Sequence, residues 1–357
     1  NGTGTIGIYG INNAVIDNNM KINVSDESFG VILNSGSGLV NRNISTVGDH
    51  GVFVYSDGGT SVKNESGADI TMNGSNSSGF YMTNGGDIVN KASITANAGA
   101  ANIGIYNKGG SIENSGDIKI GESIIRDPQN PFANSYAVGL YGEDIQSMKN
   151  TGNIEIGADA VGFYAKDSQT ETLNTGNITS AGNGAIGIFA ESSVVLNSGI
   201  ITMNGNNAVG MYANVNAVVI NDGVININGD NSVAMTASTA STAVNNGVIN
   251  LNGKSGIGGL YYGSSVFENN GIINVNNTGL EEDEKNVISK ENDTPLAVPS
   301  IVNSGVINVN ENFLNEGMRI KIRVNPETIR AAVLPEDSGA KFVADSVKFN
   351  APYFDGD

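Results

Sequence analysis

A repeat of about 24 residues runs through most of the chain. Residues 186–206 read IGIFAESSVVLNSGIITMNGN, and residues 209–230 read VGMYANVNAVVINDGVININGD. An asparagine followed by a short turn marks each copy, and nine of the eleven gaps between these asparagines span 23 to 26 residues. Such a period is typical of solenoids, whose coils are stable only when stacked on their neighbours. The asparagines are Asn18, Asn41, Asn64, Asn90, Asn114, Asn150, Asn174, Asn197, Asn221, Asn245, Asn269 and Asn303.

The pattern inside each copy selects among the solenoid classes. Aliphatic and polar residues alternate after each asparagine turn, as in Ile225, Asn226 and Ile227, and this alternation predicts a half-buried strand. A second alternation and a third short apolar stretch complete the copy, without a helical period or a leucine frame. Right-handed crossovers are the rule for parallel strands. The sequence therefore predicts an all-β, right-handed parallel β-helix of about twelve coils. We expect each repeated asparagine to bond to the amide of the next coil and to tolerate left-handed backbone.

The strand at 209–213 pairs a glycine with an aromatic residue. Its alternation predicts that Val209, Met211 and Ala213 point inward and that Gly210 and Tyr212 point outward. Two main interpretations are open: the rings stack on those of neighbouring coils, or they form a shallow track for sugar, peptide or protein. A third places the rings in the core. Across the copies, the predicted aromatic position reads Tyr9, Ile32, Phe53, Tyr81, Tyr106, Tyr141, Tyr164, Phe189, Tyr212, Thr236 and Tyr261.

Two insertions and a different C-terminal segment interrupt the repeat. Residues 121–135 and 277–300 are predicted loop insertions within a β-helix of residues 1–310, and the second carries the acidic run 281–284. Residues 311–357 lack the repeat and are expected to cap the β-helix, form a side domain or continue it in degenerate form. Loops that leave a solenoid often carry recognition. The predicted binding residues are the aromatic residues Tyr106, Tyr141, Tyr164, Phe189, Tyr212 and Tyr261, with Arg126 and Phe132 of the first insertion.

Composition argues against several functions. The net charge of −18 disfavours binding to a nucleic-acid backbone, and no apolar run is long enough to cross a bilayer. The chain has no cysteine and a single histidine, His50, and its carboxylates do not recur in catalytic pairs. We therefore predict no catalytic residues, no cofactor and no metal site. The absence of cysteine suits a chain exported by bacteria, and this chain is expected to be a piece of a larger protein.

The repeated units NTGNIEIGADAVGFYAKDS and NSGIITMNGNNAVGMYANVN resemble the passenger repeats of the large type V autotransporter adhesins of fusobacteria, RadD-like or galactose-binding. The resemblance covers roughly residues 1–310. It implies a β-helical passenger on the bacterial cell surface, exported through the outer membrane. The implied partners are a host-cell receptor protein or glycan and the surfaces of other bacteria. The alternatives are a structural spacer that projects a binding tip located elsewhere and, less favoured, a polysaccharide-active enzyme.

Overall fold

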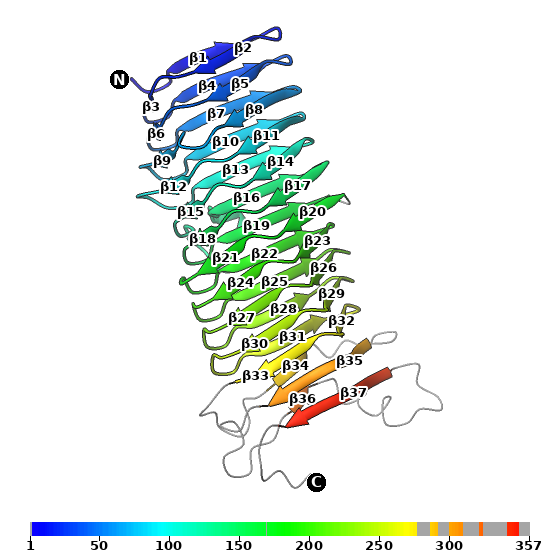
Figure 1. The fold of residues 1–357 in the computed structure, drawn as a ribbon. Coiled ribbons are helices and arrows are strands. Elements are labelled where there is room, and N and C mark those ends of the chain that lie inside the picture. Colours follow the sequence, from blue (N-terminus) through cyan, green and yellow to red (C-terminus); the bar gives the residue numbers. More distant parts are fainter. Residues whose placement is uncertain are drawn as a thin grey trace. The chain divides into compact units, whose positions relative to one another are not determined.

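A computed structural model describes residues 2–168, 170–276, 286–291, 300–309, 321–323 and 341–349. The chain divides into two compact units, Asn1–Ala185 and Ile186–Asp357. Each unit repeats the same coil of three short strands, which pair in parallel with the equivalent strands of the coils before and after (Figure 1). We call the strand with the glycine and the aromatic row A, the strand that ends at the asparagine row B, and the strand after it row C.

Strands of the first unit follow this order seven times. Row A comprises β1 (Ile6–Gly10), β4 (Phe29–Asn34), β7 (Val52–Asp57), β10 (Ser78–Thr83), β13 (Ile103–Lys108), β16 (Val138–Glu143) and β19 (Val161–Lys166). Row B comprises β2 (Val15–Asn18), β5 (Gly38–Asn41), β8 (Thr60–Asn64), β11 (Gly86–Asn90), β14 (Ser111–Asn114), β17 (Ser147–Asn150) and β20 (Glu171–Asn174). Row C comprises β3 (Ile22–Val24), β6 (Ser45–Val47), β9 (Ile70–Met72), β12 (Ile94–Ala96), β15 (Ile118–Ile120), β18 (Ile154–Ile156) and β21 (Asn177–Ser180).

The second unit continues the same pattern. Row A comprises β22 (Ile186–Glu191), β25 (Val209–Asn214), β28 (Val233–Ala237), β31 (Ile257–Tyr262), β34 (Asn286–Glu291) and β36 (Lys321–Arg323). Row B comprises β23 (Val194–Asn197), β26 (Val218–Asn221), β29 (Thr242–Asn245) and β32 (Val266–Asn269). Row C comprises β24 (Ile200–Met203), β27 (Val224–Ile227), β30 (Val248–Leu251) and β33 (Ile272–Val275). The longer strand β35 (Ser300–Val309) pairs with both β32 and β33, and β37 (Lys341–Phe349) pairs with β35. The described residues thus form the predicted parallel β-helix, with about eleven coils some 24 residues apart.

The predicted asparagine ladder is confirmed. In the second unit, Asn197 Nδ2 donates to Asn221 Oδ1 at 2.9 Å, Asn221 to Asn245 at 2.8 Å, and Asn245 to Asn269 at 2.8 Å. Asn18, Asn41, Asn64, Asn90, Asn114, Asn150 and Asn174 form the same ladder in the first unit, with distances from 2.7 to 2.8 Å. Ten of these eleven amides, all but that of Asn64, also donate to the backbone carbonyl two residues later, as Asn90 does to Ala92 at 2.9 Å. A buried amide needs such partners, so the ladder fixes where row B ends. None of these asparagines has a positive φ, so the ladder makes no use of the tolerance for left-handed backbone that was expected of them.

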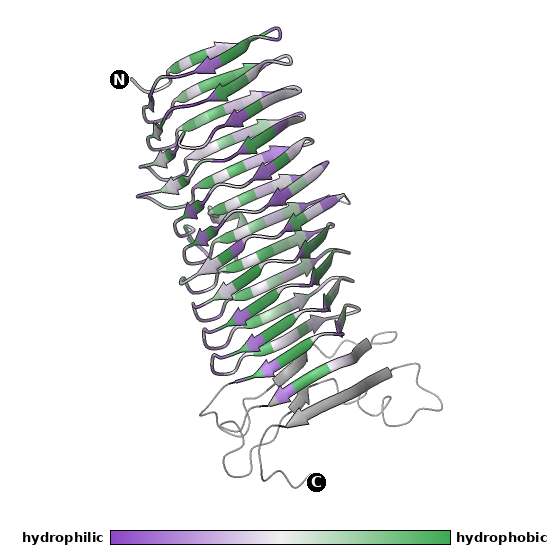
Figure 2. Ribbon diagram, viewed as in Figure 1, coloured by the Kyte–Doolittle hydropathy of each residue, from purple (hydrophilic) through white to green (hydrophobic). Residues whose placement is uncertain are grey.

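The predicted orientation of the row A glycine is wrong. Met211 and Ala213 are buried and Tyr212 is half-buried, as expected, but Val209 is only half-buried and Gly210 is buried. A Cβ on Gly210 would lie 2.5 Å from the carbonyl oxygen of Ala234 and 2.9 Å from Cγ2 of the core residue Ile225. The glycine therefore faces the interior, where these two neighbours leave no room for a side chain. Figure 2 colours the row A strands by hydropathy, with green apolar positions separated by paler ones.

The insertions and the C-terminal segment differ in outcome. Residues 121–135 leave the β-helix as a loop, which contains the short 3₁₀ helix η1 (Pro131–Ala133) and an antiparallel bridge between Ile124 and Ser135. Within the second predicted insertion, β34 pairs with β31 in row A, so this part is a coil strand and not a loop. The acidic run 281–284 lies outside the described residues, and the boundary at 310 stays a prediction. In the segment 311–357, β36 and β37 pair in parallel with β34 and β35. No helix within the described ranges has the length and apolarity needed to cross a membrane.

Candidate functional site

Five tyrosines form a continuous ladder on the outer face of row A in the first unit. The ring centroids of Tyr81 and Tyr106 are 4.6 Å apart, and those of Tyr141 and Tyr164 are 4.4 Å apart with an interplanar angle of 8°. Tyr55 stacks on Tyr81 at 6.1 Å, and Tyr106 meets Tyr141 edge to face at 4.9 Å. Because each residue pairs in register with its equivalent on the next strand, the repeat itself brings the rings together. The stacking interpretation is thus confirmed for this ladder.

An ion pair between Lys108 and Glu143 lies next to Tyr106 of the tyrosine ladder. Tyr106 donates its hydroxyl to Glu143 Oε2 at 3.0 Å, and Lys108 Nζ lies 2.9 Å from Glu143 Oε1. Burial and the hydrogen bond to Glu143 raise the pKa of Tyr106 well above its usual value. Burial raises the pKa of Glu143, but hydrogen bonds from Lys108 and Tyr106 outweigh it, so the pKa lies below its usual value. The glutamate therefore stays ionised and holds Tyr106, which is only 8% exposed, against its neighbours.

The geometry limits what this ladder can bind. Stacked rings cover one another's faces, and a sugar ring needs an open aromatic face on which to pack. A partner approaching Tyr141 or Tyr164 would therefore meet ring edges and hydroxyl groups. In the second unit, Phe189 and Tyr212 are adjacent on row A, with ring centroids 5.3 Å apart at an angle of 63°. A binding role for these residues stays a prediction.

Two positions of the predicted aromatic column are wrong. Tyr55 pairs with Ile32 and Tyr81, so Tyr55 and not Phe53 occupies the outer column; Phe53 is fully buried and packs on Phe80 at 5.9 Å. Leu260 pairs with Thr236, and Tyr261 pairs with Ala237 instead. Tyr261 is fully buried, so it cannot offer its ring to a partner in this structure. Gly259 stands where the preceding coil has Met235, and the ring of Phe267 fills the space beside it, since a Cβ on Gly259 would lie 2.5 Å from that ring.

Replacing Tyr261 with phenylalanine is expected to stabilise the protein by about 1 kcal/mol. The hydroxyl oxygen of Tyr261 is buried without a hydrogen-bond partner, and burial raises the pKa of this tyrosine. Removing the oxygen abolishes its desolvation penalty while the ring stays in place. Urea denaturation of the Tyr261→Phe variant would measure the change, with Tyr212→Phe as a control in which the hydroxyl meets Ser238 Oγ at 3.1 Å. A loss of stability in Tyr261→Phe would contradict the expectation.

The loop of residues 121–135 presents the other two predicted binding residues. Phe132 is 99% exposed at η1, and Arg126 is exposed nearby in the same loop. The loop is bonded to itself: Asn134 Oδ1 accepts the backbone N–H of Arg126 at 2.8 Å and that of Asp127 at 3.0 Å. Asn130 Oδ1 accepts the N–H of Phe132 at 3.2 Å, so the residue at the tip is held as well. A hydrogen-bonded loop that exposes a whole aromatic ring is a preorganised contact surface.

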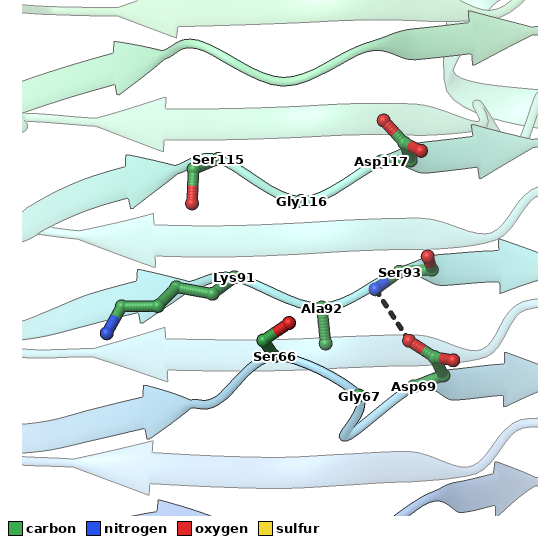
Figure 3. A pocket seen from close by; sticks show the side chains of 9 residues that line it. All are labelled: Ser66, Gly67, Asp69, Lys91, Ala92, Ser93, Ser115, Gly116 and Asp117. Atoms are coloured by element: carbon green, nitrogen blue, oxygen red, sulfur yellow. Dashed lines mark hydrogen bonds between the residues drawn. The ribbon is translucent and has the colours of Figure 1, made fainter.

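A polar groove lies along the turns between rows B and C (Figure 3). It has a volume of about 330 Å³ and crosses three coils. The first of these turns contains two more residues than the next two, because five residues separate Asn64 from Ile70, and Gly67 adopts a φ of 82° there. Figure 3 shows Asp69 and Asp117 on one side and Lys91 on the other. The lining residues are Ser66, Gly67, Asp69, Lys91, Ala92, Ser93, Ser115, Gly116 and Asp117.

Hydrogen bonds fix the acidic side of the groove. Asp69 Oδ1 accepts the N–H of Ser93 at 3.0 Å, and Asp117 Oδ1 accepts Nδ2 of Asn153 at 2.8 Å. Lys91 lines the groove, and its Nζ lies 3.1 Å from Oε2 of Glu65, a residue that is not part of the lining. The groove thus offers carboxylate and hydroxyl groups to a ligand rich in hydroxyls, without an apolar wall. Within the described residues, no three His, Asp or Glu side chains come together in a way that could hold a metal ion.

Sequence analysis missed this groove, although a signal was present. The gap of 26 residues between Asn64 and Asn90 is the longest of the regular gaps, and it reflects the wider turn. The effect of that turn on two later coils depends on how they stack, which the spacing does not give. The predicted residues, in contrast, occupy separate places. Arg126 and Phe132 lie on the loop, and Tyr261 points from row A into the core. The others lie in the outer column of row A: Tyr106, Tyr141, Tyr164, Phe189 and Tyr212.

Comparison with known proteins agrees with the fold. Neither the curated proteins nor the solved structures include a significant match. The model of the BigA third pectate lyase-like domain matches residues 1–180 and, a second time, residues 169–263. The first match alone covers half of the chain, and both matches lie within the region of regular coils. The chain therefore belongs to the family of the BigA third pectate lyase-like domain.

Proposed function

We propose that this chain is a β-helical segment of a bacterial surface adhesin, which attaches to host cells and to other bacteria. Its family is one of adhesin domains, and membership supports a surface adhesin or stalk. The repeat motifs support a finer placement among the type V autotransporter adhesins of fusobacteria, exported through the outer membrane. The description pectate lyase-like fits the β-helix itself, and we propose a role in binding without catalysis. Turnover of a polysaccharide by the purified chain would contradict that part.

The loop of residues 121–135 carries this proposal. It leaves an otherwise regular surface, its own side chains hold it in shape, and Phe132 at its tip is 99% exposed. Exposing a full phenylalanine ring to water is unfavourable, and burying it in a partner's apolar pocket would contribute about 1.5–3 kcal/mol. Aromatic and arginine side chains dominate the affinity of many protein interfaces. We therefore favour a protein receptor, with Phe132 as the anchor and Arg126 beside it.

The experiment measures binding of the fluorescently labelled chain to host epithelial cells and to partner bacteria. Phe132→Ser is expected to weaken binding about tenfold or more, as loss of a central anchor does. Met20→Ser is the matched control, because Met20 is also an exposed apolar residue, at 75%, but lies in a turn between β2 and β3. Both variants should keep the melting temperature of the parent chain. Equal binding by the Phe132→Ser variant would contradict the loop as the site.

The polar groove favours a second kind of receptor, a glycan. Replacing both Asp69 and Asp117 with asparagine would remove the charged acceptors that a sugar hydroxyl would use. A loss of cell binding in this variant, together with unchanged binding in Phe132→Ser, would assign attachment to the groove and to a carbohydrate.

The structural spacer remains the alternative function. Stacking accounts for the tyrosine ladder, and hydrogen bonding accounts for the asparagine ladder, without any external partner. Absence of binding by the parent chain to every cell type tested would favour the spacer.

A further inference from the structure

One face of the second unit is aliphatic where the first unit is polar. Row B strands point alternate residues outward, and the residue three positions after each ladder asparagine also lies on the surface. We call the residues at positions −3, −1 and +3 from Asn197, Asn221, Asn245 and Asn269 the aliphatic face, and ten of these twelve are Val, Leu or Ile. The face comprises Val194, Leu196, Ile200, Val218, Ile220, Val224, Thr242, Val244, Val248, Val266, Glu268 and Ile272.

The same positions in the first unit show that the fold does not require apolar residues there. Counted from Asn90, Asn114, Asn150 and Asn174, only Val89 and Leu173 of twelve are aliphatic. The other ten are Asp87, Ser93, Ser111, Glu113, Asp117, Ser147, Lys149, Asn153, Glu171 and Asn177. Figure 2 shows this contrast between β14 or β17 and the greener β23 and β26. The apolar character therefore belongs to the second unit and not to the β-helix in general.

The aliphatic side chains face solvent. Ile200 is 44% exposed and Ile272 is 37% exposed, and the other eight are half-buried. Their neighbours on the same strands, such as Val195 and Val219, are fully buried and fill the core. Contiguous exposed apolar side chains on a sheet are a site of association.

Charge and period indicate what covers this face. The chain carries a net charge of −18, so two copies repel over most of their surfaces, yet Glu268 is the single charged residue among these twelve. The columns run across coils that are hydrogen-bonded about 4.8 Å apart. Rows of side chains with this spacing interdigitate best with rows of the same spacing. A second copy of the chain has such rows, because its coils are spaced in the same way.

We propose that the aliphatic face packs against the same face of a second copy, so that the protein associates side by side. Four coils and three columns of side chains present roughly 400 Å² per copy, or about 800 Å² in total, which is below the ~1,200 Å² of a stable complex. The dimer is therefore weak in solution and depends on concentration. Surface rows of amides, in which Asn250 bonds to Asn226 and Asn274 to Asn250 at 2.8 Å, border the face with polar groups.

Sedimentation velocity of the parent chain tests the proposal. It is expected to show a monomer–dimer equilibrium with a dissociation constant on the order of 10 µM to 1 mM, as for small interfaces. Replacing Ile220 and Val244 together with lysine should raise this constant at least tenfold, since dimerisation would bury unpaired charges. Val89→Lys is the matched control, because it adds a lysine at the position equivalent to Ile220 in the first unit. Ile220→Thr with Val244→Thr serves as a second variant with high strand propensity, should the lysine variant fail to fold.

Cross-linking locates the contact. The chain contains no cysteine, so Ile220→Cys introduces a single thiol on the face, and Val89→Cys places one outside it. A bis-maleimide that spans about 10 Å, the separation of packed sheets, should join two copies of Ile220→Cys and not two copies of Val89→Cys. A parent chain that stays monomeric at millimolar concentration overturns the proposal, as does equal weakening of the dimer by the lysine variant and its control. The readout needs no receptor, so its failure is distinct from failure of the proposed adhesive function.

Discussion

Replacing Asn221 with leucine is expected to lower the free energy of unfolding by about 3 to 4 kcal/mol. Asn221 is fully buried, accepts Nδ2 of Asn197 at 2.9 Å and donates to Asn245 Oδ1 at 2.8 Å. Its amide also reaches the carbonyl of Gly223 at 3.3 Å. Leucine has a similar volume, so the loss comes from buried polar groups of neighbouring coils that no longer have partners. Chemical denaturation of the purified chain, followed by circular dichroism, would measure the change.

Asn228→Leu is the matched control for this prediction. Asn228 also belongs to an amide ladder, with Asn204 and Asn252 each 2.7 Å away, but all three side chains are exposed. Water can replace the lost hydrogen bonds there, so the change should stay within about 0.5 kcal/mol. Equal effects of the two substitutions would show that burial does not set the strength of the ladder.

Replacing Gly210 with alanine is expected to destabilise the second unit by about 2 to 4 kcal/mol. The new Cβ would lie 2.5 Å from the carbonyl oxygen of Ala234, a backbone atom held in the next coil, and 2.9 Å from Cγ2 of Ile225. The side chain of Ile225 can turn aside at some cost, but the carbonyl cannot move without shifting strand β28. Thermal melting would detect the effect as a lower transition temperature.

Gly38→Ala supplies the control for a glycine that the fold does not need. A Cβ there would lie 3.5 Å from the carbonyl oxygen of Ser61, which is ordinary contact, and Gly38 has no positive φ. Alanine should therefore leave stability unchanged or raise it by about 0.4–1 kcal/mol through the unfolded state. A Gly210→Ala variant as stable as Gly38→Ala would contradict the inward position of Gly210.

The two predictions separate what the sequence makes visible from what it hides. The asparagine ladder follows from spacing, because residues 24 apart in a solenoid lie on adjacent coils and a buried amide needs a partner. The place of Gly210 does not follow from spacing. Strict alternation assigns it to the outer face, whereas row A has buried residues at two consecutive positions, Gly210 and Met211.

The aromatic column shows the same limit at single residues. Tyr106, Tyr141 and Tyr164 follow the regular repeat and stack as one interpretation predicted. Tyr261 sits in a coil whose core residues differ in size from those of the preceding coil, as Gly259 and Tyr261 do from Met235 and Ala237. Phe53 lies between Val52 and Val54, which pair with Ser78 and Phe80, so it stands at the position that Gly79 has in the next coil. A motif taken from other coils assigns such residues to the wrong face, because the spacing does not show at which positions a single coil exchanges large and small residues.

The candidate sites divide along the same line. The loop with Arg126 and Phe132 was visible as an interruption of the period, but the hydrogen bonds that hold it closed involve Asn130 and Asn134, which no motif marks. The groove at Asp69 and Asp117 could not be predicted, because it forms only where three turns stack and the first is longer than the other two. The aliphatic face could be recognised only once the structure showed that Val218 and Ile220 point outward while Val219 points inward.

By itself the sequence determined the repeat, the three strands of each coil, the bonding of the asparagines from coil to coil and hence the parallel β-helix, because all of these follow from a fixed period and from local alternation. The tertiary structure alone decided which side of row A each residue faces, how turns of different length leave a groove, and where outward aliphatic residues gather into a face. These depend on close contacts between coils, where the distance from one Cβ to one carbonyl oxygen decides what fits.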